Sequence, residues 1–235
     1  GLLTSINSLL VAGGSILFQD RFEAAPALLG LAQSTVFMGV PTHYGRLMKE
    51  KGLATATKDL RLAVSGSAPL SLEIAERFAA ITGITIVERY GATETAIITA
   101  IPAGTTGRTG FVGWALPGVE IRVRQDDGST ADRAATGGLE TRGHNVFSGY
   151  WHRPDANAEA FTADGWFITG DIAEIDDEGC VRLLGRSKDL VITGGLNVYP
   201  KEVEDALDAL LKGGESAVFG VPHPDFGEGV VAVVE

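Results

Sequence analysis

The sequence is poor in cysteine and in basic residues. Cys180 is its only cysteine, so no intrachain disulfide can form, and a reducing compartment such as the cytoplasm fits best. Its 19 Lys and Arg face 30 Asp and Glu, and the formal net charge of −11 argues against a nucleic-acid or anionic-membrane partner. An anionic small molecule stays possible, because a pocket needs only a few local donors. The four histidines and the cysteine show no zinc spacing.

Long uninterrupted apolar runs are also absent. The opening GLLTSINSLLVAGGSILF is broken by Ser, Asn and a Gly pair, whereas a membrane span needs about 20 consecutive apolar residues. It also lacks the basic start of a signal peptide. We therefore interpret it as a buried helix followed by a strand at residues 15–19. The chain lacks an initial Met and ends inside a predicted strand, so we expect a piece of a longer protein. Organelle targeting upstream stays open.

What the sequence does contain is apolar residues, at 45%, and 31 glycines in 235 residues. The apolar content suffices for a substantial core and excludes a disordered chain. The glycines predict tight turns and places where the backbone approaches a ligand closely.

Strand-like and helix-like segments alternate over residues 1–102. This predicts an α/β fold, with a mostly parallel sheet and flanking helices. Over residues 103–187, Gly, Asp and Thr turns separate short strands, which predicts an antiparallel, barrel-like β segment. A strand, a Gly-Gly turn and a Pro-started helix then predict a small α+β domain over residues 188–235.

Polar motifs follow the predicted strands of the first part. In parallel sheets, ligands bind outside the carboxyl ends of the strands. SGSAP (65–69) exposes backbone groups that suit a flat ligand or a phosphate, although it also reads as a simple turn before a helix capped by Ser71. A hydrolase nucleophile at Ser67 is excluded, because an elbow needs glycine where Ser65 and Pro69 stand.

RYGATE (89–94) places an aromatic ring, a glycine, a hydroxyl and a carboxylate at a strand end. Tyr90 can stack on a planar base, and Gly91 lets the chain turn close to a ligand. Thr93 can donate to a phosphate oxygen, and Glu94 suits Mg²⁺, which typically takes one or two carboxylates plus substrate phosphates. The alternative is a solvated turn with Thr93 capping a helix.

Two further motifs lie in the second part. FITGD (167–171) ends a strand with Asp171, whose carboxylate can accept both hydroxyls of a ribose, or can simply be a β-turn aspartate. In GRSKDLVITGGLNVYPKEVE (185–204), Arg186 can reach a ribose or phosphate. Lys188 stands at the predicted domain boundary, where a few backbone rotations can swing a small domain. The alternative for both is solvated surface charge.

These motifs, in this order and spacing, resemble those of the adenylate-forming acyl-CoA synthetase family. That family includes acyl-CoA ligases, firefly-type luciferases and peptide-synthetase adenylation domains. The resemblance covers essentially the whole chain and is strongest to malonyl-CoA synthetases, through VFMGVPTHYGRL, VSGSAPL, ERYGATET, NVFSGYW and GVPHPDFGEGV. It implies that residues 1–187 belong to a large AMP-binding domain and residues 188–235 to a truncated C-terminal domain.

The resemblance implies a ligase reaction in two steps. A small carboxylate attacks the α-phosphate of ATP, giving an acyl-adenylate and pyrophosphate, and the thiol of coenzyme A then displaces AMP. By matching positions, Ser67, Ala68 and Pro69 would line the adenine and Tyr90 would lie against its face. The other implied roles are as follows: Gly91 near the nucleotide, Thr93 at the α-phosphate, Glu94 on Mg²⁺, Asp171 and Arg186 on the ribose, Lys188 as the hinge, and Gly194 and Gly195 beside the pantetheine arm.

The acyl group is predicted to be malonate or methylmalonate. Arg46 in PTHYGRL resembles a clamp for the second carboxylate of the substrate, the alternative being a surface arginine on a helix. His43 could touch the substrate but can equally well only pack. Cys180 has no base evident in the sequence and is interpreted as structural.

Two family elements fall outside the sequence. The phosphate loop with its lysine is expected upstream of Gly1, and the lysine that reaches the adenylate beyond Glu235. Two alternatives therefore stay open: a non-catalytic adenylate-binding fragment, and a ligase or adenylation domain for another acid. The sequence leaves the oligomeric state undetermined.

Overall fold

A computed structural model describes residues 2–211 and 216–234. The chain divides into two compact units, one of residues 1–91 and 99–113, the other of residues 92–98 and 114–235. The predicted boundary between a large domain and a small C-terminal domain, near Lys188, falls inside the second of these units. It stays a prediction. In the described part of the chain no helix is long and apolar enough to cross a bilayer.

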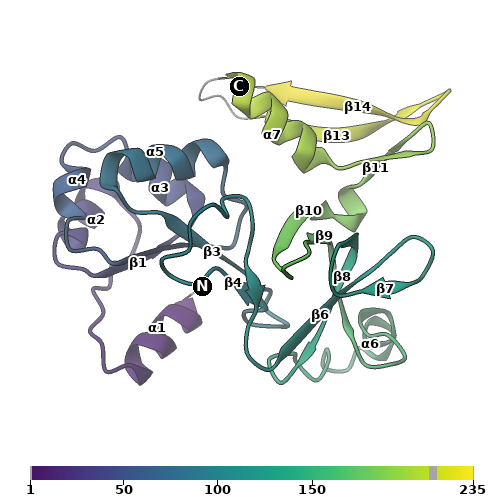
Figure 1. The fold of residues 1–235 in the computed structure, drawn as a ribbon, viewed down its shortest axis with the longest axis horizontal. Helices are drawn as coiled ribbons and strands as arrows, with labels where there is room; N and C mark the ends of the chain where they lie inside the picture. Colours follow the sequence, from purple (N-terminus) through teal and green to yellow (C-terminus); the bar gives the residue numbers. More distant parts are fainter. Residues whose placement is uncertain (1, 212–215, 235) are drawn as a thin grey trace. The chain divides into compact units, whose positions relative to one another are not determined.

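The first unit contains the predicted alternation of helices and strands (Figure 1). Its elements are α1 (Leu2–Val11), α2 (Ala24–Leu31), β1 (Val36–Gly39), α3 (Pro41–Leu47), α4 (Leu53–Ala56), β2 (Leu62–Ser65), α5 (Leu72–Thr82), β3 (Ile86–Tyr90) and β4 (Thr99–Ala100). β1, β2 and β3 are parallel neighbours, and β4 pairs antiparallel with β3. The predicted α/β class is confirmed, and so is the cap at Ser71, whose hydroxyl accepts the Ile74 amide at 3.3 Å.

Side chains that point alternately to the two faces of the sheet form the core of this unit. Ala63 and Ile86 pack with side chains from α2, α3, α4 and α5 in one cluster. Their sequence neighbours Val64 and Val87 point to the other face, where they pack with Ile101. This is the expected result of a two-residue side-chain period in strands that are buried on both faces.

The prediction for the first 19 residues is partly wrong. A helix forms, but Leu10 and Val11 at its end are 64% and 91% exposed rather than buried. Residues 15–19 form no strand. An apolar pattern shows which residues favour burial, but a strand also needs a neighbour that completes its hydrogen bonds.

The second unit is rich in antiparallel strands (Figure 1). Its elements are β5 (Trp114–Ala115), β6 (Val119–Arg124), β7 (Thr130–Ala131), β8 (Ala135–Gly143), α6 (Pro154–Ala160), β9 (Phe167–Ile175), β10 (Val181–Arg186), a 3₁₀ turn (Ser187–Asp189), β11 (Val191–Thr193), β12 (Leu196–Val198), α7 (Pro200–Leu211), β13 (Ser216–His223) and β14 (Gly227–Val234). The helix that begins at Pro200 is the predicted one. The short helices α4 and α6 are not anticipated by the sequence.

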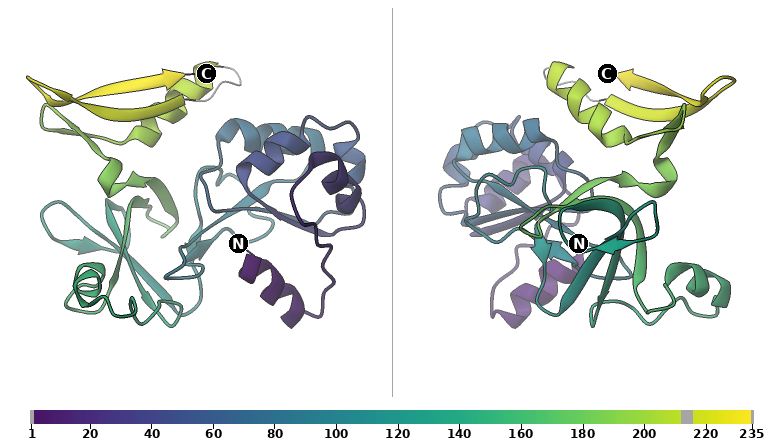
Figure 2. Two further views of the ribbon diagram at one scale, coloured as in Figure 1. Left: turned by 180° about the vertical axis from the view of Figure 1, so that it is seen from behind. Right: turned by 45° about the vertical axis from the view of Figure 1, so that its right-hand side comes forward.

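Two sheets organise this unit. One has the order β10-β9-β8-β6-β7 and is open rather than a closed barrel, which refines the predicted barrel-like segment. The other has the order β12-β11-β14-β13, and Figure 2 shows β13 and β14 as a long hairpin beside α7. Cys180 is fully buried immediately before β10, in agreement with a structural role.

Tyr44 supplies a test of the packing in the first unit. Its ring is fully buried, edge-on to Phe37 and Phe78, and its hydroxyl donates to the Val64 carbonyl at 2.7 Å. Tyr44→Phe is expected to lower the free energy of unfolding by about 1–2 kcal/mol, because the Val64 carbonyl loses a buried partner. Urea titration of the complete protein measures the change.

The matched control is Tyr199→Phe. Tyr199 is half-buried, and its hydroxyl makes no hydrogen bond to a described residue. An equal midpoint for Tyr44→Phe and for the unmodified protein would show that the Tyr44 hydroxyl contributes nothing to stability.

Candidate nucleotide and substrate site

Three predicted motifs of the first unit lie at one edge of its sheet. β1, β2 and β3 run parallel in register, with Gly39 beside Ser65 and Ser65 beside Glu88. Their carboxyl ends therefore lead from the same edge into α3, into the loop 65–69, and into Tyr90–Gly91. This is the edge at which parallel sheets bind ligands.

The loop after β2 has a strained backbone and a buried hydroxyl without a hydrogen-bond partner among the described residues. Ser67 has a left-handed backbone with φ of 73°, which is uncommon for a residue with a Cβ. Ser65 is fully buried, and its hydroxyl has no hydrogen-bond partner in the described chain. The side chains of Ser67, Ala68 and Pro69 are exposed. Strain and unsatisfied polar atoms are concentrated at functional sites, so the loop is a good candidate for one.

Arg89 lies against this loop and was not singled out by the sequence. A Cβ built on Gly66 would come within 3.3 Å of the Arg89 guanidinium carbon, so the Arg89 side chain lies in close contact with the loop. The buried Arg89 Nε has no hydrogen-bond partner among the described residues. A guanidinium group that has an unpaired N–H donor, at the sheet edge where ligands bind, suits a carboxylate or phosphate ligand. Next to it, Tyr90 and Gly91 are half-buried.

The two predicted substrate residues lie on α3. His43 is half-buried and stacks on Phe22, with ring centroids 3.9 Å apart. Burial lowers the pKa of its imidazole, and the nearby Arg46 charge lowers that pKa further. Arg46 itself is exposed in the last turn of the helix. A carboxylate clamp therefore stays a prediction for Arg46.

The segment 92–98 belongs to the second unit and carries Thr93 and Glu94. It is a turn, not a helix, so Thr93 caps no helix. The hydroxyl of buried Thr95 instead accepts the Ala92 amide at 3.0 Å. Thr93 is left exposed, with its hydroxyl available to a ligand.

Glu94 is held by a loop more than 50 residues away. The Tyr150 hydroxyl donates to its Oε1 at 3.0 Å, and the Phe147 amide donates to its backbone carbonyl at 2.7 Å. Burial raises the pKa of Tyr150, and the hydrogen bond to Glu94 raises it further, so the hydroxyl keeps its proton near neutral pH. Sequence reasoning missed Tyr150, because no local pattern signals so distant a partner.

Asp171 and Arg186 form an ion pair on adjacent strands. Arg186 Nε lies 3.0 Å from Asp171 Oδ1, with the arginine 53% and the carboxylate 13% exposed. The register of β9 and β10 shifts between Leu183 and Gly185, and this bulge brings Arg186 opposite Asp171. A regular ladder would have put Gly185 there. The structure thus brings together the two residues predicted for the ribose.

Contacts between aromatic rings join the loop at Glu94 to the strand of Asp171. The Phe147 ring lies edge-on to Phe167, with centroids 5.5 Å apart. Phe167 begins β9, and Asp171 is four residues further along that strand. At about 3.3 Å per residue, Phe167 and Asp171 are about 13 Å apart along the strand.

The residues predicted for the hinge and for the passage of the pantetheine arm lie further along the chain. Lys188 is exposed in the 3₁₀ turn between β10 and β11. Gly194 and Gly195, with φ of 56° and 82°, make the tight turn between β11 and β12. Both glycines are exposed.

Comparison with known proteins identifies the chain. The family profile described as AMP-binding enzyme matches residues 1–151. The chain belongs to the AMP-binding enzyme family. It is 37% identical over 202 residues to a long-chain-fatty-acid–CoA ligase of Yersinia pestis, a match covering 85% of this chain and 36% of that protein. It is also 37% identical over 235 residues to the mitochondrial malonate–CoA ligase of Bos taurus, covering 86% and 40%.

Solved AMP-binding enzymes share the fold. ATP-bound MatB from Rhodopseudomonas palustris superposes with a TM-score of 0.94 at 48% identity, covering 100% of this chain and 47% of that one. A malonyl-CoA ligase solved with methylmalonyl-CoA and AMP gives 0.74 at 42% identity, covering 99% and 51%. The chain therefore spans between about a third and a half of the length of these relatives.

Mg²⁺ is the metal that an AMP-binding enzyme implies here, and Glu94 fits it. Its carboxylate is half-buried, with one oxygen bound by Tyr150. Within residues 2–211 and 216–234, the structure contains no group of three or more His, Cys, Asp or Glu side chains that could hold a metal ion. A single carboxylate suffices for Mg²⁺ that is held mainly by substrate phosphates and water.

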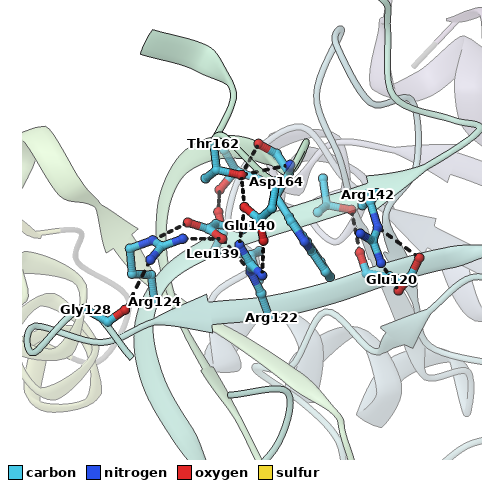
Figure 3. Close-up of polar contacts among 12 residues, drawn as sticks. Glu120, Arg122, Arg124, Gly128, Leu139, Glu140, Arg142, Thr162 and Asp164 are labelled. Carbon is cyan, nitrogen blue, oxygen red and sulfur yellow. Dashed lines mark hydrogen bonds and ion pairs between the residues drawn. The ribbon is translucent and has the colours of Figure 1, made fainter. Parts of the chain in front are cut away.

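A second polar cluster lies elsewhere in this unit and contains none of the predicted site residues. A shallow depression of about 420 Å³ is lined by Glu120, Ile121, Arg122, Thr130, Ala131, Asp132 and Trp166. Beside it, Glu140 lies between Arg122 and Arg124 (Figure 3). Hydrogen bonds from Arg122 and then Thr162 hold the pKa of Asp164 well below its usual range. Since the donors are already paired, we assign this cluster to stability.

Proposed function

We propose that the complete protein is an ATP-dependent acyl-CoA ligase for a small dicarboxylic acid, malonate or methylmalonate. The observation that carries this is the likeness to ATP-bound MatB over the whole chain at 48% identity. A second similar structure, a malonyl-CoA ligase with the products methylmalonyl-CoA and AMP bound, agrees with it. The relatives that act on long-chain fatty acids make a different acyl group the main competing assignment.

The proposed chemistry joins two anions. An oxygen of the substrate carboxylate attacks the α-phosphorus of ATP, the bond to the β-phosphate oxygen breaks, and pyrophosphate leaves. The thiol of coenzyme A then loses its proton to solvent, its sulfur attacks the acyl carbon, the bond from that carbon to the phosphate oxygen breaks, and AMP leaves. Attack of one anion on another needs charge neutralised where it develops, which Mg²⁺ and positioned donors supply.

The residues of this chain bind and orient the nucleotide in the proposal. Ser67, Ala68 and Pro69 line the adenine with Tyr90 on its face, and Gly91 allows the backbone to approach. The Asp171–Arg186 pair receives the ribose. Thr93, whose side chain is exposed, donates to the α-phosphate, and Glu94 holds Mg²⁺.

The two steps need different surroundings for one adenylate intermediate. A C-terminal domain that begins at residue 188 and rotates about Lys188 would supply them in turn and exclude water from the mixed anhydride. Gly194 and Gly195 would then lie beside the pantetheine arm. Lys188 lies exposed in the short 3₁₀ turn between β10 and β11, which is the position that the proposal gives to the hinge.

The experiment supplies the complete protein with ATP, Mg²⁺ and coenzyme A, and with malonate, methylmalonate, acetate or a long-chain fatty acid. AMP release and the CoA thioester are measured for each acid. We expect malonate or methylmalonate to give the highest kcat/KM. Preference for a monocarboxylate would overturn the substrate. Nucleotide binding without thioester formation would favour the non-catalytic alternative.

Arg46 provides the specificity test. If it binds the second carboxylate, Arg46→Gln should lower kcat/KM for malonate relative to acetate by about fivefold, since an ion pair at an exposed arginine contributes about 1 kcal/mol. Arg61→Gln, a change to an exposed arginine immediately before β2, is the matched control. An unchanged ratio would remove Arg46 from the clamp and direct attention to Arg89.

A further inference from the structure

The loop that holds Glu94 does so from two directions at once. The Phe147 amide binds the Glu94 backbone carbonyl at 2.7 Å, and the Tyr150 hydroxyl binds its side chain at 3.0 Å. The side chain of a glutamate otherwise turns about three torsions. Two contacts from one loop therefore fix both where the residue stands and which way its carboxylate points.

The loop is itself rigidly built. The Tyr150 amide donates to Asn157 Oδ1 at 2.6 Å, and the Asn157 amide nitrogen donates back to the Tyr150 carbonyl at 3.0 Å. The Tyr150 ring packs edge-on to Phe147 at 4.8 Å. A Cβ on Gly149, whose φ is 128°, would come within 3.0 Å of Asn157 Oδ1, so this position requires glycine.

The second anchor of the loop is aromatic. The Phe147 ring lies 5.7 Å from Phe161 and 5.5 Å from Phe167 between ring centroids. Phe167 begins β9, the strand that carries Asp171. The loop that holds Glu94 is thus packed against both the end of α6 and the sheet. A solvated surface turn would not need these contacts.

We propose that Tyr150 is a positioning residue for Glu94: it holds one carboxylate oxygen so that the other is presented to the metal. The inference rests on the proposed role of Glu94 as the Mg²⁺ ligand. Groups that orient a metal ligand from outside the coordination sphere typically change metal affinity by 10- to 100-fold when removed. Tyr150→Phe deletes only the hydroxyl and keeps the ring on Phe147, so the fold should be preserved.

The test measures Mn²⁺ binding by electron paramagnetic resonance, with the complete protein and a non-hydrolysable ATP analogue. We expect Tyr150→Phe to raise the Mn²⁺ Kd about tenfold. Trp151→Phe, a change to the adjacent and 86% exposed aromatic, should leave the Kd unchanged. The Mg²⁺ concentration that gives half-maximal AMP release should rise in parallel, with kcat at saturating Mg²⁺ nearly retained.

A double-mutant cycle separates the two proposals. Glu94→Gln should weaken Mn²⁺ binding, and adding Tyr150→Phe to it should have no further effect, because Tyr150 acts through Glu94. If Glu94→Gln weakens binding and Tyr150→Phe does not, the positioning role is refuted while the metal role of Glu94 stands. Additive losses would likewise refute positioning. If Glu94→Gln leaves the Kd unchanged, both proposals fall.

Discussion

Replacing Glu94 by Gln in the complete protein should slow adenylate formation by about 100- to 1000-fold. A metal ion at the transferring phosphate contributes several kcal/mol of transition-state stabilisation, and each 1.36 kcal/mol is a factor of ten in rate. Gln keeps the size of the side chain and can still accept from Tyr150, so the loop 145–150 should keep its position. The variant removes charge from the predicted metal ligand and little else.

Pyrophosphate exchange measures the first step without coenzyme A and so isolates adenylation. Glu159→Gln, a change to an exposed carboxylate on α6, is the matched control and should exchange at the wild-type rate. An exchange rate within threefold of wild type for Glu94→Gln would exclude Glu94 as the metal ligand.

The second large effect is expected at Glu140, and it concerns stability. This carboxylate is 2% exposed and accepts from Arg122 Nε and Arg124 Nε, each at 2.6 Å (Figure 3). Glu140→Gln leaves two guanidinium groups facing an amide. Breaking a buried ion pair typically costs 3–5 kcal/mol. The lower end, about 3 kcal/mol, is expected, because Asp164 still pairs with Arg122 at 2.9 Å.

Hydrogen exchange locates the effect within the complete protein. Amides of β6 and β8 should lose about 100-fold of protection in Glu140→Gln, while those of β1 to β3 stay unchanged. Glu120→Gln is the control, because Glu120 pairs with Arg142 on the same two strands but is 58% exposed. If both variants exchange alike, the burial of Glu140 contributes nothing to its interaction with the arginines.

Trp166 connects these strands through a further contact that no sequence motif predicts. The guanidinium carbons of Arg122 and Arg142 lie 4.2 and 4.6 Å from the centroid of its indole ring. The two arginines at alternate positions of β6 and the single arginine of β8 look like solvated surface charge in the sequence. Only the pairing of the two strands, with Arg122 opposite Glu140 and Glu120 opposite Arg142, makes them a network.

The sequence by itself determined the family and many, though not all, of the element types. The alternation of strands and helices, the cap at Ser71 and the helix beginning at Pro200 all depend on residues within a few positions of one another, which is the range at which backbone preferences act. The ordered motifs from residue 65 to residue 204 carry the family likeness.

Only the tertiary structure decided which side chains meet. The bulge between Leu183 and Gly185 puts Arg186, and not a glycine, opposite Asp171, because a slip of one residue turns every later side chain of a strand to the other face. Tyr150 reaches Glu94 across 56 positions of sequence because the intervening strands fold back, and no local pattern encodes that return.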